Sequence, residues 1–161
     1  MIIRDRELPV LELLRRQIAG VATEDELSRF RYPTAISRTL GIRLVAVELG
    51  SATVEIDTDP AIHGNQQGTV HGGLLTELAD AAIGTAHSTV VGPGESFTSI
   101  DLRAVFLRPV WEDTLRATAR PVHAGRTITH YSCEVVRGDG KAVAVVTSVV
   151  TTLSAARSHG R

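Results

Sequence analysis

The apolar positions divide the chain into a short amino-terminal part with a helical period and a longer part dominated by strand-like alternation. Residues 7–17 place leucine and valine on one helical face, which Ile18 continues, and this predicts an amphipathic helix. A second helix is expected near residues 24–30, because Thr23 followed by Glu26 forms a capping-box pattern. The Tyr-Pro pair at residues 32–33 ends it, since the residue before a proline avoids helical geometry.

From about residue 40 apolar and polar residues alternate, which is the period of half-buried strands. The expected strands cover residues 41–49, 52–58, 98–107, 115–122, 127–136 and 141–153. Between the second and third, a leucine- and alanine-rich stretch predicts one long helix that begins at Gly72 or Gly73 and ends near residues 91–94. A single helix this apolar must be wrapped by the sheet. The expected fold class is therefore α+β, a curved antiparallel sheet around one long central helix.

Length and charge narrow the class of protein. A chain of 161 residues suits one folded domain, here expected over residues 40–153, with a helical extension at 1–39 and a flexible tail at 154–161. The formal net charge of −1 argues against a nucleic-acid or anionic-membrane partner. No apolar run approaches the length of a membrane span, and Asp5 interrupts any signal-peptide pattern. We therefore expect a soluble cytoplasmic protein.

Cysteine and histidine usage excludes several kinds of site. Cys133 is the only cysteine, so the chain forms no internal disulfide and no thiolate metal cluster. It shares a predicted strand face with Tyr131 and Val135, which indicates a core position. His63, His71 and His87 have no HxH or HExxH spacing, so no metal is expected.

The candidate chemistry gathers around the start of the central helix. The first N–H groups of a helix have no intrahelical partner and carry the positive end of its dipole. Glycine at positions 72 and 73 lets a ligand approach these groups, which would suit a carbonyl oxygen that gains negative charge. Asp80 follows about two turns later among apolar residues, where burial should raise its pKa toward the range of a general base.

Each of these features also has a structural explanation. The glycine pair at 72–73 could be only a tight helix entrance, and His71 a hydrogen-bonded structural histidine. Asp80 could be a satisfied polar group at a subunit contact. The spacing of the residues carries more weight than any one of them.

Asn65, the run His71-Gly72-Gly73 and Asp80 together resemble the signature of the PaaI-type acyl-CoA thioesterases, a family with the hotdog fold. In that family a loop Asn or Gln precedes the His-Gly pair by six residues, and an Asp or Glu follows the His by nine. Residues 101–109, 125–126 and 140–141 resemble the strand and turns that follow, so the resemblance covers residues 40–153.

The resemblance implies specific roles at this site. The backbone N–H of Gly72 would polarise the thioester carbonyl, and Asp80 of the opposite subunit would activate water or attack the carbonyl directly. Asn65 would position the carbonyl or the water, and His71 would support Asn65 by hydrogen bonding. The family thus implies a homodimer or homotetramer that hydrolyses acyl-CoA, with CoA as part of the substrate and no further cofactor.

Substrate contacts follow from the same comparison. Gly73 would line the carbonyl site, and basic residues at strand ends and turns would meet the CoA phosphates. The basic candidates are Arg108, Arg126 and Lys141, of which Arg126 is favoured. An acyl pocket that accepts aryl or medium-chain groups is expected to be formed by Leu74, Leu78, Ala81, Ala82 and Phe106.

Two other functions remain open from the sequence. His63 and Glu77 are fourteen residues apart, a spacing that resembles the catalytic pair of hotdog 3-hydroxyacyl-carrier-protein dehydratases. The proline-rich sequence that separates that pair is missing here, so Glu77 is interpreted as a polar helix residue. A hotdog protein that binds acyl-CoA without turning it over is the second alternative, although such a protein has no need for Asp80.

Overall fold

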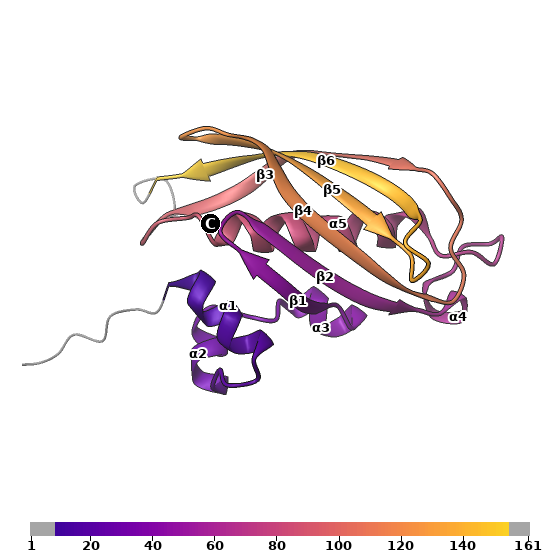
Figure 1. Cartoon of the computed structure of the whole chain (residues 1–161), viewed down its shortest axis with the longest axis horizontal. Helices are drawn as coiled ribbons and strands as arrows, with labels where there is room; N and C mark the ends of the chain where they lie inside the picture. The colour runs from indigo at the N-terminus through magenta and orange to yellow at the C-terminus, as the bar shows by residue number, and fades with distance from the viewer. Residues whose placement is uncertain (1–8, 155–161) are drawn as a thin grey trace, which may run out of the picture.

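The computed structural model describes residues 9–154 (Figure 1). The elements are α1 (Val10–Ile18), α2 (Glu24–Arg29), α3 (Ala35–Leu40), β1 (Arg43–Glu48), β2 (Ser51–Thr58), α4 (Pro60–His63), α5 (Gly72–Ser88), β3 (Ser96–Phe106), β4 (Asp113–Ala124), β5 (Ile128–Val136) and β6 (Ala142–Leu153). The predicted order of helices, two strands, one long helix and four further strands is confirmed.

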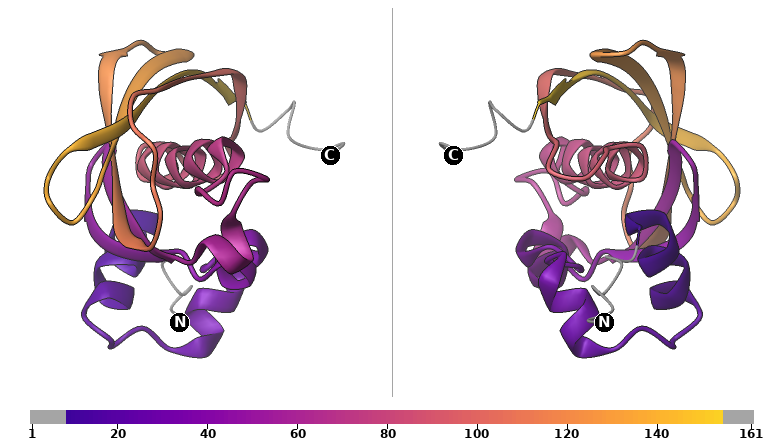
Figure 2. Two further views of the ribbon diagram at one scale, coloured as in Figure 1. Left: turned by 90° about the vertical axis from the view of Figure 1, so that its right-hand side faces the viewer. Right: turned by 90° about the vertical axis from the view of Figure 1, so that its left-hand side faces the viewer.

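The six strands form one antiparallel sheet in the order β1-β2-β4-β5-β6-β3, and this sheet curves around α5 (Figure 2). One face of α5 is fully buried against it, through Leu78, Ala82 and Ile83. These side chains pack in a core with Ile56 of β2 and Leu115 of β4. The expected α+β class, with a sheet wrapped around one central helix, is confirmed.

The start of α5 is fixed by His71. This residue is the N-cap, and its Nδ1 accepts a hydrogen bond from Gly73 N–H at 3.0 Å. The carbonyl of His71 also accepts from Leu74 N–H, which tightens the first turn. The helix therefore begins at Gly72, one of the two predicted starts, and it ends at Ser88, before the predicted end near residues 91–94.

The amino-terminal extension contains more helix than expected. The capping box of Thr23 and Glu26 is confirmed, but α1 begins at Val10, with Pro9 as its N-cap, and not at residue 7. Residues 35–40, which were not expected to be helical, form α3. Its signals were local: the Thr34 side chain caps it, and Gly41 ends it at a φ of 76° that glycine adopts without strain.

The short helix α4 was also missed, since the sequence predicted no element over residues 60–63. Asp59 accepts from Ala61 N–H at 2.8 Å through its side chain, and Pro60 occupies the first helical position. His63 Nδ1 accepts from Asp59 N–H at 3.1 Å, which closes this turn.

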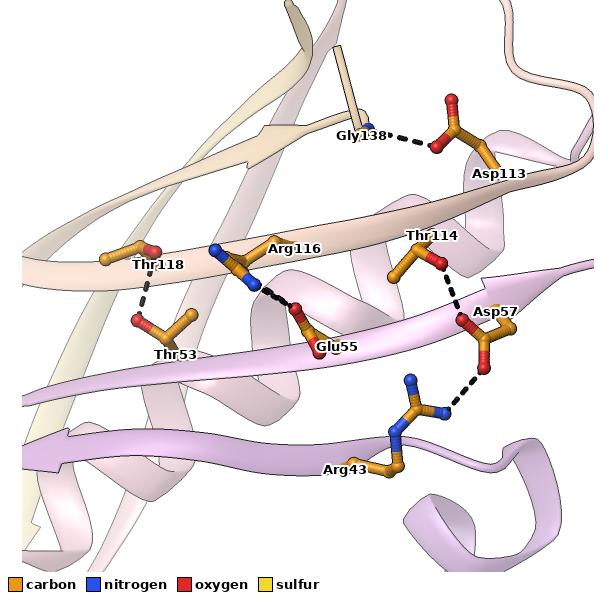
Figure 3. A network of polar contacts seen from close by, with 9 residues as sticks. All are labelled: Arg43, Thr53, Glu55, Asp57, Asp113, Thr114, Arg116, Thr118 and Gly138. Atoms are coloured by element: carbon orange, nitrogen blue, oxygen red, sulfur yellow. Dashed lines mark hydrogen bonds and ion pairs between the residues drawn. The ribbon is translucent and has the colours of Figure 1, made fainter. Parts of the chain in front are cut away.

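Polar side chains join β1, β2 and β4 on the outer face of the sheet (Figure 3). Asp57 accepts from Arg43 at 2.9 Å and from Thr114 at 2.7 Å, and Arg116 donates from Nε to Glu55 at 2.8 Å. Exposed pairs of this kind contribute about 0–1 kcal/mol each. The sheet is therefore held mainly by its backbone ladder and by the core around α5.

The strand β3 forms one edge of the sheet, and its exposed side chains are unusually apolar. Ile100, Val105 and Phe106 are 60%, 55% and 53% exposed. A long edge strand with an unpaired backbone and apolar side chains is a surface on which another chain can pair.

Two predictions fall largely beyond these residues. The expected tail at 154–161 lies outside the described residues except for Ser154, and so does the chain start at residues 1–8. Among the helices of residues 9–154, none is long and apolar enough to cross a membrane.

Candidate active site

Asn65 shapes the loop that leads to α5. Its Oδ1 accepts from Gln67 N–H at 2.9 Å and from Thr69 N–H at 3.3 Å, and its Nδ2 donates to Thr69 Oγ1 at 3.0 Å. The backbone of Asn65 also donates to Thr69. A side-chain amide has two N–H donors, so one of them remains for a ligand after the bond to Thr69.

Gly72 presents an unpaired donor at the helix start. Within residues 9–154, no group accepts a hydrogen bond from Gly72 N–H, whereas the next N–H is capped by His71. A Cβ on Gly72 would lie 2.9 Å from Cζ of Phe106, closer than real contacts allow. An added Cβ at this position therefore requires either the Phe106 ring or the start of α5 to shift.

His71 forms hydrogen bonds with Gly73 and His63 and not with Asn65, the partner that was expected. Its Nδ1 accepts from Gly73 N–H, its own N–H donates to His63 O at 2.8 Å, and no hydrogen bond joins it to Asn65. The expectation that His71 supports Asn65 by hydrogen bonding is wrong. Its position before a helix start favours the capping role, because the side chain can reach the second N–H of the helix.

These residues line one open groove of about 540 Å³. Its walls include the predicted site residues Asn65, His71, Gly72, Gly73, Phe106 and Arg108. The exposed side chain of Arg108 is anchored at the rim by a hydrogen bond from Nη1 to Ala142 O at 2.6 Å. The groove therefore combines a free helix-terminal donor with a guanidinium group at its edge.

Asp80 lines a different cavity, of about 240 Å³, between α5 and the amino-terminal helices. Burial raises the pKa of the half-buried Asp80 carboxyl, as expected, and a hydrogen bond with the Ser99 side chain opposes this rise. Glu77 lines the same cavity, and its pKa is raised by burial and then by the charge of Asp80. Two carboxyl groups therefore share one partly desolvated space.

A single chain does not bring Asp80 to the donor of Gly72. The two residues are eight positions apart on α5, which corresponds to about 12 Å along a helix axis at 1.5 Å per residue. A base or nucleophile must lie about 3 Å from the carbon under attack. If both residues act on one carbonyl, they must come from different copies of the chain.

The structure places the other predicted substrate-binding residues in different surroundings. Arg126 is exposed in the turn between β4 and β5, which lies beside the carboxyl end of α5, whereas Gly72 opens the amino end (Figure 1). Leu74 packs partly buried against the core. Leu78 and Ala82 are fully buried in that core, so their expected place in the acyl pocket is wrong.

The competing sites lose support in the structure. His63 serves its own turn through Nδ1, and His87 is buried between Tyr131 Oη at 3.1 Å and Thr152 Oγ1 at 3.0 Å. In the described part of the chain, no three metal-binding side chains gather. Cys133 is fully buried and burial raises its pKa to about 12, which confirms it as a core residue.

Sequence reasoning missed the surroundings of Asp80. Ala81, which was expected in the acyl pocket, does line the cavity of Asp80, and so do Glu77, three residues before Asp80, and Gly84, four after it. Residues three and four apart share one face of a helix, so the spacing of Glu77 and Gly84 was an available signal. Ser99 and Tyr32 come from distant segments, and no spacing in the sequence could have placed them beside Asp80.

Comparison with known proteins identifies the family of this chain. The sequence model of the thioesterase superfamily matches residues 67–144 of this chain. The acyl-coenzyme A thioesterase PaaI of Escherichia coli is 36% identical over 114 residues, which cover 69% of this chain and 77% of the relative. The 1,4-dihydroxy-2-naphthoyl-CoA hydrolase of Listeria monocytogenes is 32% identical over 94 residues, which cover 57% of this chain and 74% of the relative.

The fold comparison gives the same result. The solved structure of Escherichia coli PaaI superimposes with a TM-score of 0.73 at 28% identity, and the match covers 89% of this chain and 96% of that one. The chain therefore belongs to the thioesterase superfamily. Within it, the fold and the motif from Asn65 to Asp80 place the chain among the PaaI-type hotdog proteins.

Proposed function

We propose that this protein is an acyl-CoA thioesterase that hydrolyses aryl- or medium-chain acyl-CoA to the free acid and CoA. The observation that carries the proposal is the unpaired Gly72 N–H in a groove with Asn65, on the same helix as a carboxylate whose pKa is raised by burial. Relatives named as acyl-CoA thioesterases support this substrate class. The dehydratase and binding-only alternatives are not favoured by these relatives.

The proposed reaction is an acyl transfer to water. The substrate carbonyl accepts a hydrogen bond from Gly72 N–H, where the helix dipole stabilises the oxyanion. Asp80 of the partner subunit either takes a proton from the attacking water or attacks the carbonyl itself. The tetrahedral intermediate then expels the CoA thiolate, which takes up the proton removed from water. If Asp80 attacks directly, the mixed anhydride that forms is hydrolysed by water, which releases the free acid and restores the carboxylate. Asn65 contributes its remaining N–H to the carbonyl or the water.

The nucleotide end of CoA lies at the rim of the groove in this proposal. Arg108 meets a phosphate there, because a guanidinium recognises phosphate oxygens through several N–H donors. Arg126 and Lys141 stay predictions, and within one chain Arg126 lies far from Gly72. The reaction requires no metal or further cofactor, since a carboxylate and an oxyanion donor suffice for thioester hydrolysis.

The shared site requires a homodimer, and β3 offers the surface for it. Along β3, Phe106 contacts Gly72, whereas Ser99 contacts Asp80. Antiparallel pairing of two β3 strands around a two-fold axis near Leu102 and Arg103 would set Phe106 of one copy opposite Ser99 of the partner subunit. Gly72 would then face the partner's Asp80 across the new strand pair, which is the arrangement that the reaction needs.

The test of the proposed activity is thiol release from a panel of phenylacetyl-, benzoyl-, hexanoyl- and crotonyl-CoA. We expect hydrolysis by the native protein and a loss of at least about 100-fold in kcat for Asp80→Asn, which preserves shape but removes the charge. Hydration of crotonyl-CoA without thiol release would instead support His63 and Glu77. Binding of the thioesters without either reaction would support the binding-only alternative.

The shared site is tested separately by mixing two inactive variants. Asn65→Asp keeps the acceptor that shapes the loop, and Asp80→Asn keeps the carboxylate's size. A mixed dimer has one site that carries both substitutions and one site that carries neither. Refolding the variants together at equal amounts should restore about a quarter of native activity, because half of the dimers are mixed. No recovery in dimers shown to be mixed would mean that one chain supplies the whole site.

Two finer proposals complete this function. The enzyme acts in the cytoplasm, and its assembly is the dimer described above or a tetramer built from two such dimers. Cell fractionation tests the first, and analytical ultracentrifugation tests the second.

A further inference from the structure

We propose that the amino-terminal helical extension is the length gauge for the acyl group. In this proposal, which rests on the proposed function, the cavity beside Asp80 receives the acyl group, and residues 32–37 with Gln17 form the wall that limits it. The substrate class is an uncharged acyl group with about eight non-hydrogen atoms or fewer within the cavity.

The cavity lies where an acyl group must go. The carbonyl carbon is held next to Asp80, and Asp80 lines the cavity together with Ala81 and Gly84 of the same helix face. Leu44 of β1 and Val54 of β2 give it an apolar side. An acyl chain that leaves the carbonyl on this side enters an apolar space without crossing the core.

The extension forms one side of this space. Tyr32, Pro33, Thr34, Ile36 and Ser37 all line the cavity, and Figure 2 shows the amino-terminal helices below α5. These residues precede the region that matches the superfamily model, residues 67–144. The wall is therefore supplied by the amino-terminal extension, before the residues that the family model matches.

The wall is fastened to the rest of the fold. Tyr32 donates from its hydroxyl to Ser88 Oγ at 2.8 Å, at the carboxyl end of α5. Ser37 and Thr34 join through their hydroxyl groups at 2.8 Å, and Leu14 of α1 belongs to the main core. A wall held in this way keeps its distance from Asp80 and can reject an acyl group that is too long.

Volume and charge define what fits. A volume of about 240 Å³ accommodates about eight non-hydrogen atoms at roughly 30 Å³ each, the volume of a water molecule in the liquid. Glu77 and Asp80 are the charged residues of the lining, and the described residues around the cavity include no lysine or arginine. A distal carboxylate on the acyl group would meet two acidic groups and no cation.

The native enzyme should show a sharp length profile with saturated acyl-CoA esters from two to sixteen carbons. We expect kcat/KM to rise about fourfold with each added methylene, the value that follows from burial of a CH₂ group, up to about eight carbons. It should then fall at least about tenfold by twelve carbons, because the longer chain meets the wall. Adipoyl-CoA should react at least about 100-fold more slowly than hexanoyl-CoA, since its carboxylate would be buried without a partner.

Two substitutions should shift the preferred acyl chain length in opposite directions. A Cβ on Gly84 has only Phe97 Cε2 nearby, at 4.0 Å, so the side chain of Gly84→Leu has room to enter the cavity, and the optimum should shift to shorter chains. Ile36 is 47% exposed, so Ile36→Ala opens the wall with little loss of core packing, and the optimum should shift to longer chains. The matched control is Val21→Ala, which trims an aliphatic residue of the same extension that is 58% exposed, and it should keep the native profile.

The outcomes separate this inference from the proposed function. An active native enzyme whose optimum is the same in Gly84→Leu and Ile36→Ala, both folded by thermal denaturation, overturns the length gauge and leaves the thioesterase assignment intact. If Gly84→Leu does not fold, Ile36→Ala decides alone. A native protein that hydrolyses no CoA thioester overturns both proposals.

Discussion

The contact between Gly72 and Phe106 predicts that one added methyl group will disable the oxyanion site. In Gly72→Ala, the new Cβ would lie 2.9 Å from Cζ and 3.2 Å from Cε1 and Cε2 of Phe106. Ordinary carbon contacts are about 3.5–4.0 Å. The ring and the helix start must therefore separate by roughly 0.6–1.1 Å, the difference between these distances.

The loss of activity depends on whether the Phe106 ring or the start of α5 moves. In an isolated chain the ring of Phe106 is half exposed and could swing away. In the proposed dimer β3 is paired and the ring is packed, so the start of α5 moves and takes Gly72 N–H with it. A misplacement of about 1 Å at a catalytic group can lower the rate about 100-fold, which equals about 2.7 kcal/mol of transition-state stabilisation.

A double-mutant cycle on kcat/KM tests this reasoning. Phe106→Val removes the ring but keeps a strand-forming residue, and it makes room for the added Cβ. We expect Gly72→Ala to cost about 100-fold in the native background and less than about threefold in Phe106→Val, with dimerisation and thermal stability monitored in each. Full activity of Gly72→Ala, or an equal loss in both backgrounds, would refute the steric argument.

Three further predictions follow from burial and charge. Asp80→Asn should unfold at a higher temperature than the native protein at pH 7. Burial raises the pKa of Asp80 in the folded state, so the ionised carboxylate destabilises the fold at this pH. This destabilisation, and with it the higher stability of the variant, disappears below the ordinary aspartate pKa of 3.8. A native protein at least as stable as the variant at pH 7 would contradict this sign. Ser99→Ala removes the hydrogen bond that holds the pKa of Asp80 down, so the acidic limb of its pH–rate profile should move to higher pH, and an unchanged limb would separate Ser99 from the carboxyl. Cys133 should react with a thiol reagent only at the rate of unfolding, because it is fully buried and its pKa is raised to about 12; fast labelling of the folded protein would count against its core position.

The sequence predicted the architecture because the pattern of α5 and of the strands is unambiguous. The glycine pair after His71 marked the helix start, and the alternation of residues 52–58 and 141–153 marked strands that are half-buried in the structure. The short helices α3 and α4 were missed because each has only one or two turns, too few for a periodic pattern. Their local signals were the caps at Thr34 and Asp59, with Gly41 after α3 and Pro60 at the start of α4.

The candidate site was predicted unevenly for a physical reason. Asn65, Gly72 and their groove are close in sequence, so spacing alone brought them together. Leu78 and Ala82 were expected in the acyl pocket because they are apolar, but both are fully buried in the core. The face of α5 that lines the proposed acyl cavity carries the expected Ala81 with Glu77 and Asp80, and it is completed by Tyr32, which a loop from the extension delivers. Contacts of this kind depend on tertiary packing and leave no periodic trace.

The place of Gly72 and Asp80 on one continuous helix has a consequence for the whole assembly. In the proposed dimer, each α5 gives its first N–H to one reaction centre and its carboxylate to the other. A helix is rigid over the two turns that separate these groups. In such a dimer, a substrate that displaced the helix at one centre would also displace the donor at the other, so turnover at the two centres would be coupled.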